Sequence, residues 1–258
     1  MQLHPVIDIA QDFGHRLLER QWSPANRLTG RAAMRAAAAD LDELIHDPLR
    51  AALSALHPDA RWVDDPDERA SLDGGDWWAV DDVEGAVNLL HGRPEWCISI
   101  ALIRDRRPVL AVIYQPVGDR LFTAEPGAGA YENGARLAVS PKTDFADAIV
   151  ETSQVGDEPE ALKSRIGQAI GALMSRALLV RTTIPTTFPL LSLAAGRTDA
   201  FWQYAPALTG VAAATLIATE AGATATDLTG APWHSGADSL LVTPPALHEA
   251  ALKAMADL

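Results

Sequence analysis

The stretch WWAVDDVEGAVNLLHG, residues 77–92, constrains this chain more than any other part of it. It opens with an aromatic and β-branched run, which is typical of a buried strand, and then places three acids within four residues. Because side chains alternate across a strand, the carboxylates of Asp81 and Glu84 converge only if the chain turns between them, and Gly85 gives the backbone that freedom. Such a group of oxygens predicts a hard divalent cation, and the alternative is a solvated acidic turn after an edge strand.

The composition predicts a folded protein outside the membrane. With 258 residues and 48% hydrophobic content, the chain can bury one large core or two modest ones. It contains no run of about eighteen apolar residues, and its first residues lack the basic end and apolar centre of a secretory signal. We therefore expect no membrane partner and a cytoplasmic location.

Charge and cysteine content narrow the classes of function. Asp and Glu outnumber Lys and Arg by 34 to 21, and the net charge of −13 argues against nucleic acid as a partner. An anionic substrate needs a cation or a local basic patch to offset the repulsion from this negative charge. Cys97 is the only cysteine, so no internal disulfide and no cysteine-built zinc site can form. We expect it to be a small core residue.

The pattern of expected elements changes once along the chain. Helical periodicity covers residues 6–21 and 31–56, where Pro48 marks either a kink or the junction of two shorter helices. Short strands separated by turns fill residues 95–140, and Glu132-Asn-Gly-Ala is a strong hairpin signal. Beyond this antiparallel meander, strands and helices alternate, which is typical of an α/β part.

The acidic stretch resembles the signature of the inositol monophosphatase family, within the Mg²⁺-dependent, Li⁺-sensitive phosphatases. In that signature a tryptophan leads into Asp-Pro-(Ile/Leu)-Asp-Gly-(Thr/Ser), followed by Asn, an aromatic residue and often His-Gly. The matching residues are Trp78, Asp81, Gly85, Asn88, His91, Gly92 and Pro94. Three positions depart from it: Asp82 stands for the proline, Glu84 for the second aspartate and Ala86 for the threonine.

The resemblance extends to Ser140 and implies the fold of the family. That fold is a layered αβαβα sandwich, with an antiparallel sheet in an α+β part at residues 1–143 and a smaller α/β part at residues 144–258. The site is expected in the cleft between the two parts, and a homodimer is expected as in the family.

Family members hydrolyse phosphate monoesters with Mg²⁺, and the resemblance assigns ligands for the tighter of two metals. These ligands correspond to Asp65, Asp81 and the backbone carbonyl of Val83. A slip of one residue in the alignment makes Asp64 the ligand in place of Asp65.

The second metal of the family needs both signature aspartates and a third aspartate from a Trp-Asp pair. Glu84 stands in place of the second signature aspartate, a metal-binding and catalytic position, and its side chain is longer than that of aspartate by one methylene. The Trp-Asp pair falls on Thr209 and Gly210, and a glycine offers no side chain to a metal. We therefore expect at most a single weak Mg²⁺ site.

The catalytic and substrate positions are altered as well. Asp42 matches the aspartate that helps to orient the attacking water, although Ala39 stands where the family has a threonine, and the alternative is an exposed helical carboxylate. The family's Gly-(Ser/Thr)-Ala segment, which helps to hold the substrate, falls on Ile184-Pro185-Thr186. The substrate-binding positions are Gly85, Ala86, Thr186 and Tyr204.

These features predict an inositol-monophosphatase-like protein with an atypical site. If it is active, we expect a weak Mg²⁺-dependent phosphomonoesterase acting on a small sugar, polyol or nucleotide phosphate. The alternative is a non-hydrolytic protein on the same scaffold, either a repurposed enzyme of a specialised pathway or a ligand-binding or regulatory pseudoenzyme. In both cases the expected partner is a small anionic or polyol ligand.

Overall fold

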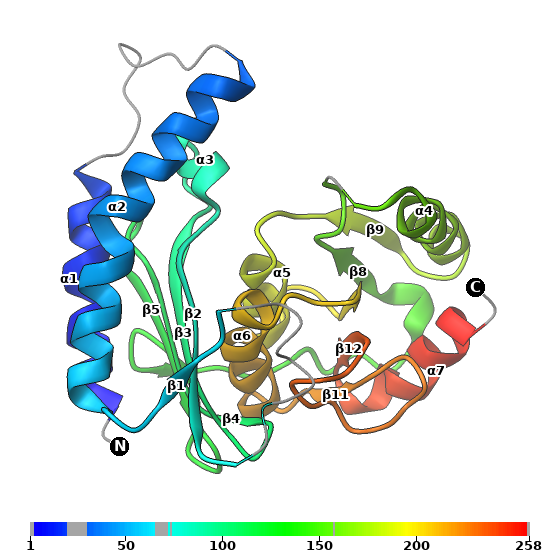
Figure 1. The fold of residues 1–258 in the computed structure, drawn as a ribbon. Coiled ribbons are helices and arrows are strands. Elements are labelled where there is room, and N and C mark those ends of the chain that lie inside the picture. The colour runs from blue at the N-terminus through cyan, green and yellow to red at the C-terminus, as the bar shows by residue number, and fades with distance from the viewer. Residues whose placement is uncertain (1–2, 20–29, 65–71, 73, 157, 257–258) are drawn as a thin grey trace.

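The computed structural model describes residues 3–19, 30–64, 72, 74–156 and 158–256. Within them the chain forms five layers, in which two sheets alternate with three pairs of helices (Figure 1). The layers are α1 (Leu3–Leu18) with α2 (Arg31–Leu56), the first sheet, α5 (Thr187–Ala194) with α6 (Leu208–Glu220), the second sheet, and α4 (Glu160–Met174) with α7 (Pro245–Ala256). This is the layered αβαβα sandwich that the sequence predicts.

The outer layer of α1 and α2 forms because both helices are amphipathic. Apolar residues recur three or four positions apart, so each helix buries one stripe of side chains against the first sheet. These stripes are Val6, Ala10, Phe13 and Leu17 in α1, and Leu41, Ile45, Leu49 and Leu53 in α2. The helix α2 continues through Pro48, so the expected alternative of two shorter helices is wrong.

The first sheet confirms the predicted meander. Its order is β1-β2-β3-β4-β5-β6-β7, with only the β1–β2 pair parallel among the strands of the described residues. The strands are β1 (Arg61–Trp62), β2 (Asp76–Glu84), β3 (Cys97–Arg104), β4 (Arg107–Gln115), β5 (Arg120–Glu125), β6 (Gly129–Glu132) and β7 (Ala135–Arg136). The predicted hairpin turn lies between β6 and β7, where Asn133 and Gly134 have φ values of 47° and 78°.

The second sheet has the order β11-β12-β10-β8-β9. Its strands are β8 (Ile149–Thr152), β9 (Leu179–Thr182), β10 (Ala200–Tyr204), β11 (Thr224–Thr226) and β12 (Ser239–Thr243). The helix α6 lies between the two sheets, and ten of its residues are buried. Apolar residues therefore cover it on nearly all sides, in contrast to α1.

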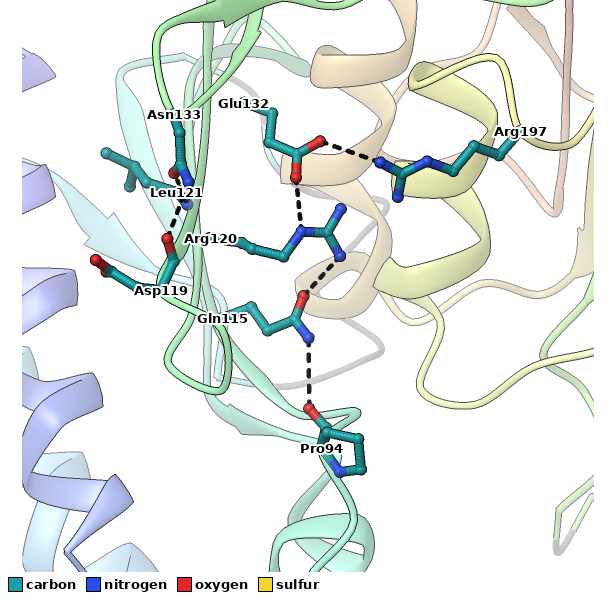
Figure 2. A network of polar contacts seen from close by, with 8 residues as sticks. All are labelled: Pro94, Gln115, Asp119, Arg120, Leu121, Glu132, Asn133 and Arg197. Atoms are coloured by element: carbon teal, nitrogen blue, oxygen red, sulfur yellow. Dashed lines mark hydrogen bonds and ion pairs between the residues drawn. The ribbon is translucent and has the colours of Figure 1, made fainter.

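A polar network ties the first sheet to the segment after α5 (Figure 2). Arg120 lies at its centre and donates to Glu132 Oε1 at 2.6 Å and to Gln115 Oε1 at 3.2 Å. Glu132 also pairs with Arg197 at 3.7 Å, and Gln115 donates to the carbonyl of Pro94 at 3.5 Å. The network thus connects the end of the acidic stretch with the C-terminal half of the chain.

The structure bears on two further expectations, the division of the chain into two parts and the location outside the membrane. The division of the chain after residue 143 stays a prediction, since one apolar core includes residues from both halves. Among the described residues, no helix is both long and apolar enough to cross a membrane.

Candidate active site

The end of β2 brings two carboxylates onto one face through a bulge. Asp81 pairs with Ser99 and Glu84 pairs with Cys97, so β2 holds one residue more than β3 between the two pairs. Cys97 packs in the core that contains α5 and α6, so both carboxylates lie on that side of the sheet. Asp81 and Glu84 therefore converge as the sequence predicts, but a bulge brings them together rather than a turn at Gly85.

Gly85 follows the bulge in a conformation that excludes other residues. Its φ is 91°, and a Cβ atom there would lie 2.7 Å from the carbonyl oxygen of Glu95 and 3.0 Å from Pro185. Asn88, in the short helix α3 (Ala86–Leu90), donates to the carbonyls of Glu95 and Ile184 at 2.7 Å and 3.2 Å. The segment before α5 is thus held directly against the acidic stretch.

The carboxylate of Glu84 is bound by the protein itself. Glu84 is only 5% exposed, and its Oε1 accepts the backbone N–H of Thr187 at 2.9 Å. Its Oε2 accepts the hydroxyl of Thr187, which also lies 3.4 Å from the carbonyl oxygen of Gly210. Two residues that are 103 positions apart in the chain thus form a direct link between β2 and the first turn of α5.

This environment favours a proton on Glu84. Burial raises the pKa of its carboxyl well above the usual value, and the nearby charge of Asp81 raises it further. The backbone donors of Thr187 and Thr186 oppose the shift without cancelling it. Burial also raises the pKa of the Cys97 thiol, and the charges of Glu84 and Asp81 add to that effect. Both shifts have the same two causes, burial and the negative charge of neighbouring acids.

Gly210 lies opposite Glu84 in α6. A Cβ atom at this position would lie 3.8 Å from Oε1 of Glu84 and 3.9 Å from the Cβ of Thr186. The structure therefore brings together the two positions that the sequence assigned to the second metal. A side chain at position 210 would point at Glu84, and glycine leaves that direction without an oxygen.

The other predicted metal ligands differ in where they lie and in what they contact. Asp65 lies outside the described residues. Asp64, the alternative, is held by Arg50 of α2 at 2.5 Å and 3.0 Å, and this guanidinium lowers the pKa of the Asp64 carboxyl. Val83 is buried, and its backbone N–H donates to Asp81 Oδ1 at 3.2 Å. Within the described part of the chain, no group of three or more His, Cys, Asp or Glu residues could hold a metal ion.

The catalytic and substrate positions are only partly gathered around Glu84. Asp42 belongs to α2, but its side chain lies outside the described part of the structure. Ala86 is the first residue of α3, and Thr186 precedes α5 with its hydroxyl 2.9 Å from that of Ser153. These two positions therefore lie next to the acidic stretch, as expected.

Tyr204 lies on the other face of the second sheet. Its ring contacts Trp202 at 5.3 Å and the guanidinium of Arg165 at 4.0 Å, in the core beneath α4 and α7. Burial raises the pKa of its phenol. Side chains alternate along β10, so Gln203 faces the opposite side, toward the core with α5 and α6. The amide oxygen of Gln203 is buried and has no hydrogen-bond partner among the described residues.

Sequence reasoning missed Thr187, which supplies both donors to Glu84. The segment Ile184-Pro185-Thr186-Thr187 precedes an apolar helix, and threonine is common where helices begin, because side chains there satisfy unpaired backbone groups. This signal marks the start of α5. It does not indicate that the helix would receive a carboxylate from the other half of the chain.

The fold and this site define a phosphatase-like α/β sandwich, with acids at the end of a strand facing the first turns of two helices. The model of the inositol monophosphatase family matches residues 6–258. The chain is 32% identical over 215 residues to inositol monophosphatase 2 of Homo sapiens, covering 78% of this chain and 73% of that protein. It is 31% identical over 220 residues to inositol-1-monophosphatase of Mesorhizobium japonicum, covering 83% and 80%.

Solved structures agree with the sequence comparisons. The extragenic suppressor protein suhB of Bartonella henselae superposes with a TM-score of 0.76 at 26% identity, covering 98% of this chain and 97% of that chain. An inositol monophosphatase of Zymomonas mobilis superposes with a TM-score of 0.79 at 19% identity, covering 98% and 96%, which shows the shared fold. The chain belongs to the inositol monophosphatase family.

Proposed function

We propose that this protein binds a small phosphate ester at the end of β2 and is at most a weak Mg²⁺-dependent phosphomonoesterase. Its family and fold support a phosphatase-like function. The observation that carries the finer proposal is the bonding of Glu84 to Thr187, with Gly210 opposite. Two-metal hydrolysis needs carboxylate oxygens aimed at both cations, and here one carboxylate is engaged while the facing position has none.

The residues that remain fit one divalent cation better than two. Asp81, the carbonyl of Val83 and Asp65 would hold Mg²⁺, because hard cations prefer carboxylate and carbonyl oxygens. When bound, the ion would polarise a phosphoryl oxygen and activate water. The proximity of Asp81 and Glu84 supports this assignment, since burial first and repulsion second raise the pKa of Glu84, and a cation would relieve the repulsion.

The residues around the signature support slow chemistry. Ala86 has no hydroxyl to position a water, and Asp42 would have to orient the nucleophile without that partner. Loss of a positioned base typically costs about 10²–10⁴-fold in rate. Gly85, Thr186 and Tyr204 stay predicted substrate positions, and the buried amide oxygen of Gln203 is a further candidate to contact a hydroxyl group of the ligand.

The alternative is a non-hydrolytic binding protein of the same fold. The bond between Glu84 and Thr187 favours it, because it joins the two sides of the site with protein atoms alone. A homodimer in the cytoplasm is part of both proposals. The ligand would be a small anionic or polyol compound in either case.

Phosphate release from inositol, sugar and nucleotide monophosphates, with Mg²⁺ or Mn²⁺, tests the proposal. Asp81→Asn should lower the activity by about 10²-fold or more, since it removes a metal ligand. Asp82→Asn is a matched control, because Asp82 is the neighbouring acid and bonds His46 at 3.0 Å. Activity that is unchanged by a chelator and by Asp81→Asn would contradict the hydrolase proposal.

A variant that rebuilds the second site separates the two candidates. Gly210→Asp, Glu84→Asp and Ala86→Thr together should raise the hydrolysis rate if only those groups are missing. If the triple variant folds and binds Mn²⁺ but shows no gain, the substrate pocket itself has diverged, and the binding protein is favoured.

A further inference from the structure

A second candidate site lies away from the acidic stretch, at the other end of β3. A groove of about 480 Å³ lies between the β3–β4 turn, the middle and end of α6, and β11. Among its lining residues are Arg107, Val109, Thr215, Leu216, Ala225 and Trp233. Seven residues of β3 separate Arg104 in this groove from Cys97 beside Glu84, a span of about 23 Å at 3.3 Å per residue.

The size and walls of this groove suit a small organic molecule. Pockets that bind such ligands typically enclose about 300–1,000 Å³ and carry mostly apolar walls with a few polar groups. Here Val109, Leu216, Ala225 and the ring of Trp233 provide apolar walls. They come from the first sheet, from α6 and from the second sheet, so an occupant would contact three layers.

The rim of the groove is basic although the protein is strongly acidic. Arg104, Arg106 and Arg107 gather at the β3–β4 turn, and Asp105 lies among them. Arg104 is held by Asp76 at 2.7 Å, and Arg106 lies 3.0 Å from a ring nitrogen of His234. The side chain of Arg107 is exposed and makes no hydrogen bond or ion pair with the described residues. One cation at the rim is thus available to an anion.

The positive charge near the β3–β4 turn affects the pKa of His234. Burial lowers the pKa of His234, and the positive charges of Arg106 and Arg107 lower it further. The effect of these arginines therefore exceeds that of Asp227, which raises the pKa of His234. A protein of net charge −13 has a local positive field here.

Two buried polar groups in the walls have no partner. Thr215 is 2% exposed and Trp233 is 7% exposed, and both line the groove. Neither the hydroxyl of Thr215 nor the indole N–H of Trp233 has a hydrogen-bond partner among the described residues. Both atoms are closed to solvent, so an occupant of the groove would reach them only if the wall shifted.

We propose that this groove binds a small organic anion with an apolar body. Its carboxylate would meet Arg107 at the rim, and its apolar part would pack between Leu216 and Trp233. Arg107 at the rim favours an anion over an uncharged sugar, and the apolar walls favour an apolar body over a polyol. The site is separate from the cleft with Glu84, so binding requires no catalytic activity.

Calorimetric titration of the full chain with 2-naphthoate tests the proposal, with uncharged 2-naphthylmethanol as the comparison ligand. We expect saturable binding of one naphthoate, weaker binding of the alcohol, and weaker binding at high salt. Arg107→Gln should weaken naphthoate binding by about fivefold, because a partly exposed ion pair contributes modestly. Arg16→Gln is the matched control, since Arg16 is a similarly exposed arginine on α1.

Two further variants test the position of the ligand. Ala225→Leu should abolish binding by filling the groove, and Asp81→Asn should leave it unchanged. Arg107 is exposed, so we expect Arg107→Gln to fold. If Ala225→Leu does not fold, the result for Arg107→Gln tests the proposal. Failure of 2-naphthoate to saturate at about 1 mM, or equal affinity of the parent and Arg107→Gln, would overturn the proposal. Loss of binding in Asp81→Asn would also overturn it by moving the ligand to the cleft.

Discussion

The two ends of β2 each hold an acid, but with different partners. At its start, Asp76 accepts two bonds of 2.7 Å from Arg104 and lies 2.5 Å from His57. At its end, Glu84 accepts uncharged donors, the backbone N–H and the hydroxyl of Thr187. Arg104 lowers the pKa of Asp76 to about 2, with His57 as a further cause, whereas burial beside Asp81 raises that of Glu84.

The difference shows what an acid needs in order to stay charged inside this fold. Asp76 has the Arg104 guanidinium on one side and the His57 ring on the other, and the interactions with these partners exceed the cost of removing water. Glu84 accepts hydrogen bonds from uncharged donors, and the cost of burial exceeds what they contribute. Within one strand, therefore, the start is a structural ion pair and the end is a buried acid whose pKa is raised.

Removing the hydroxyl donor should give the largest effect on stability. Thr187→Val leaves Oε2 of a buried carboxyl without its donor, and we expect the free energy of unfolding to fall by about 2–3 kcal/mol. Urea unfolding at pH 7 measures this change. Thr187→Ser keeps the hydroxyl and is the control. A loss in Thr187→Ser with none in Thr187→Val would mean that packing of the methyl group matters and the bond does not.

The ion pair at the start of β2 should have an intermediate effect. Asp76→Asn should lower the free energy of unfolding by about 1–2 kcal/mol at pH 7, because it removes the partner of Arg104 and His57. Asp76 has a lowered pKa, so its contribution is present above the unfolded value of about 3.9 and is lost as the pH falls toward about 2. The parent and the variant should therefore converge in acid. A constant difference down to pH 2 would contradict this account.

Glu84 should show the smallest effect, and one of opposite sign. Its folded pKa is raised, so the folded state holds the proton more tightly, and stability declines as the pH rises above the unfolded value of about 4.3. Glu84→Gln removes this decline and should raise the free energy of unfolding at pH 8 by about 1 kcal/mol, since the amide can still accept from Thr187. Unfolding curves from pH 4 to pH 8 measure it. A parent whose stability is flat in this range would show that Glu84 is charged in both states.

Much of the fold could be predicted from residues that are close in sequence. The apolar stripes of α1 and α2, the turn at Asn133 and the all-apolar pattern of α6 each express a local preference. Local signals are less decisive where neighbours determine the outcome. The helix α2 continues through Pro48, although the sequence left open a junction of two shorter helices there. Packing of whole layers places Tyr204 against the core with α4 and α7, and its role as a substrate position stays a prediction.

The sequence by itself determined the family and the place of Asp81 and Glu84 at the end of a strand, because motifs and periodicities are local properties. The order of the five layers followed from the resemblance to that family. Only the tertiary structure decided what surrounds Glu84. Three distant segments contribute to these surroundings: the bulge in β2, the donors of Thr187, and Gly210, which has no side chain. They lie together because the two sheets enclose α5 and α6. Burial and partners set the charge of an acid, and no stretch of sequence contains either.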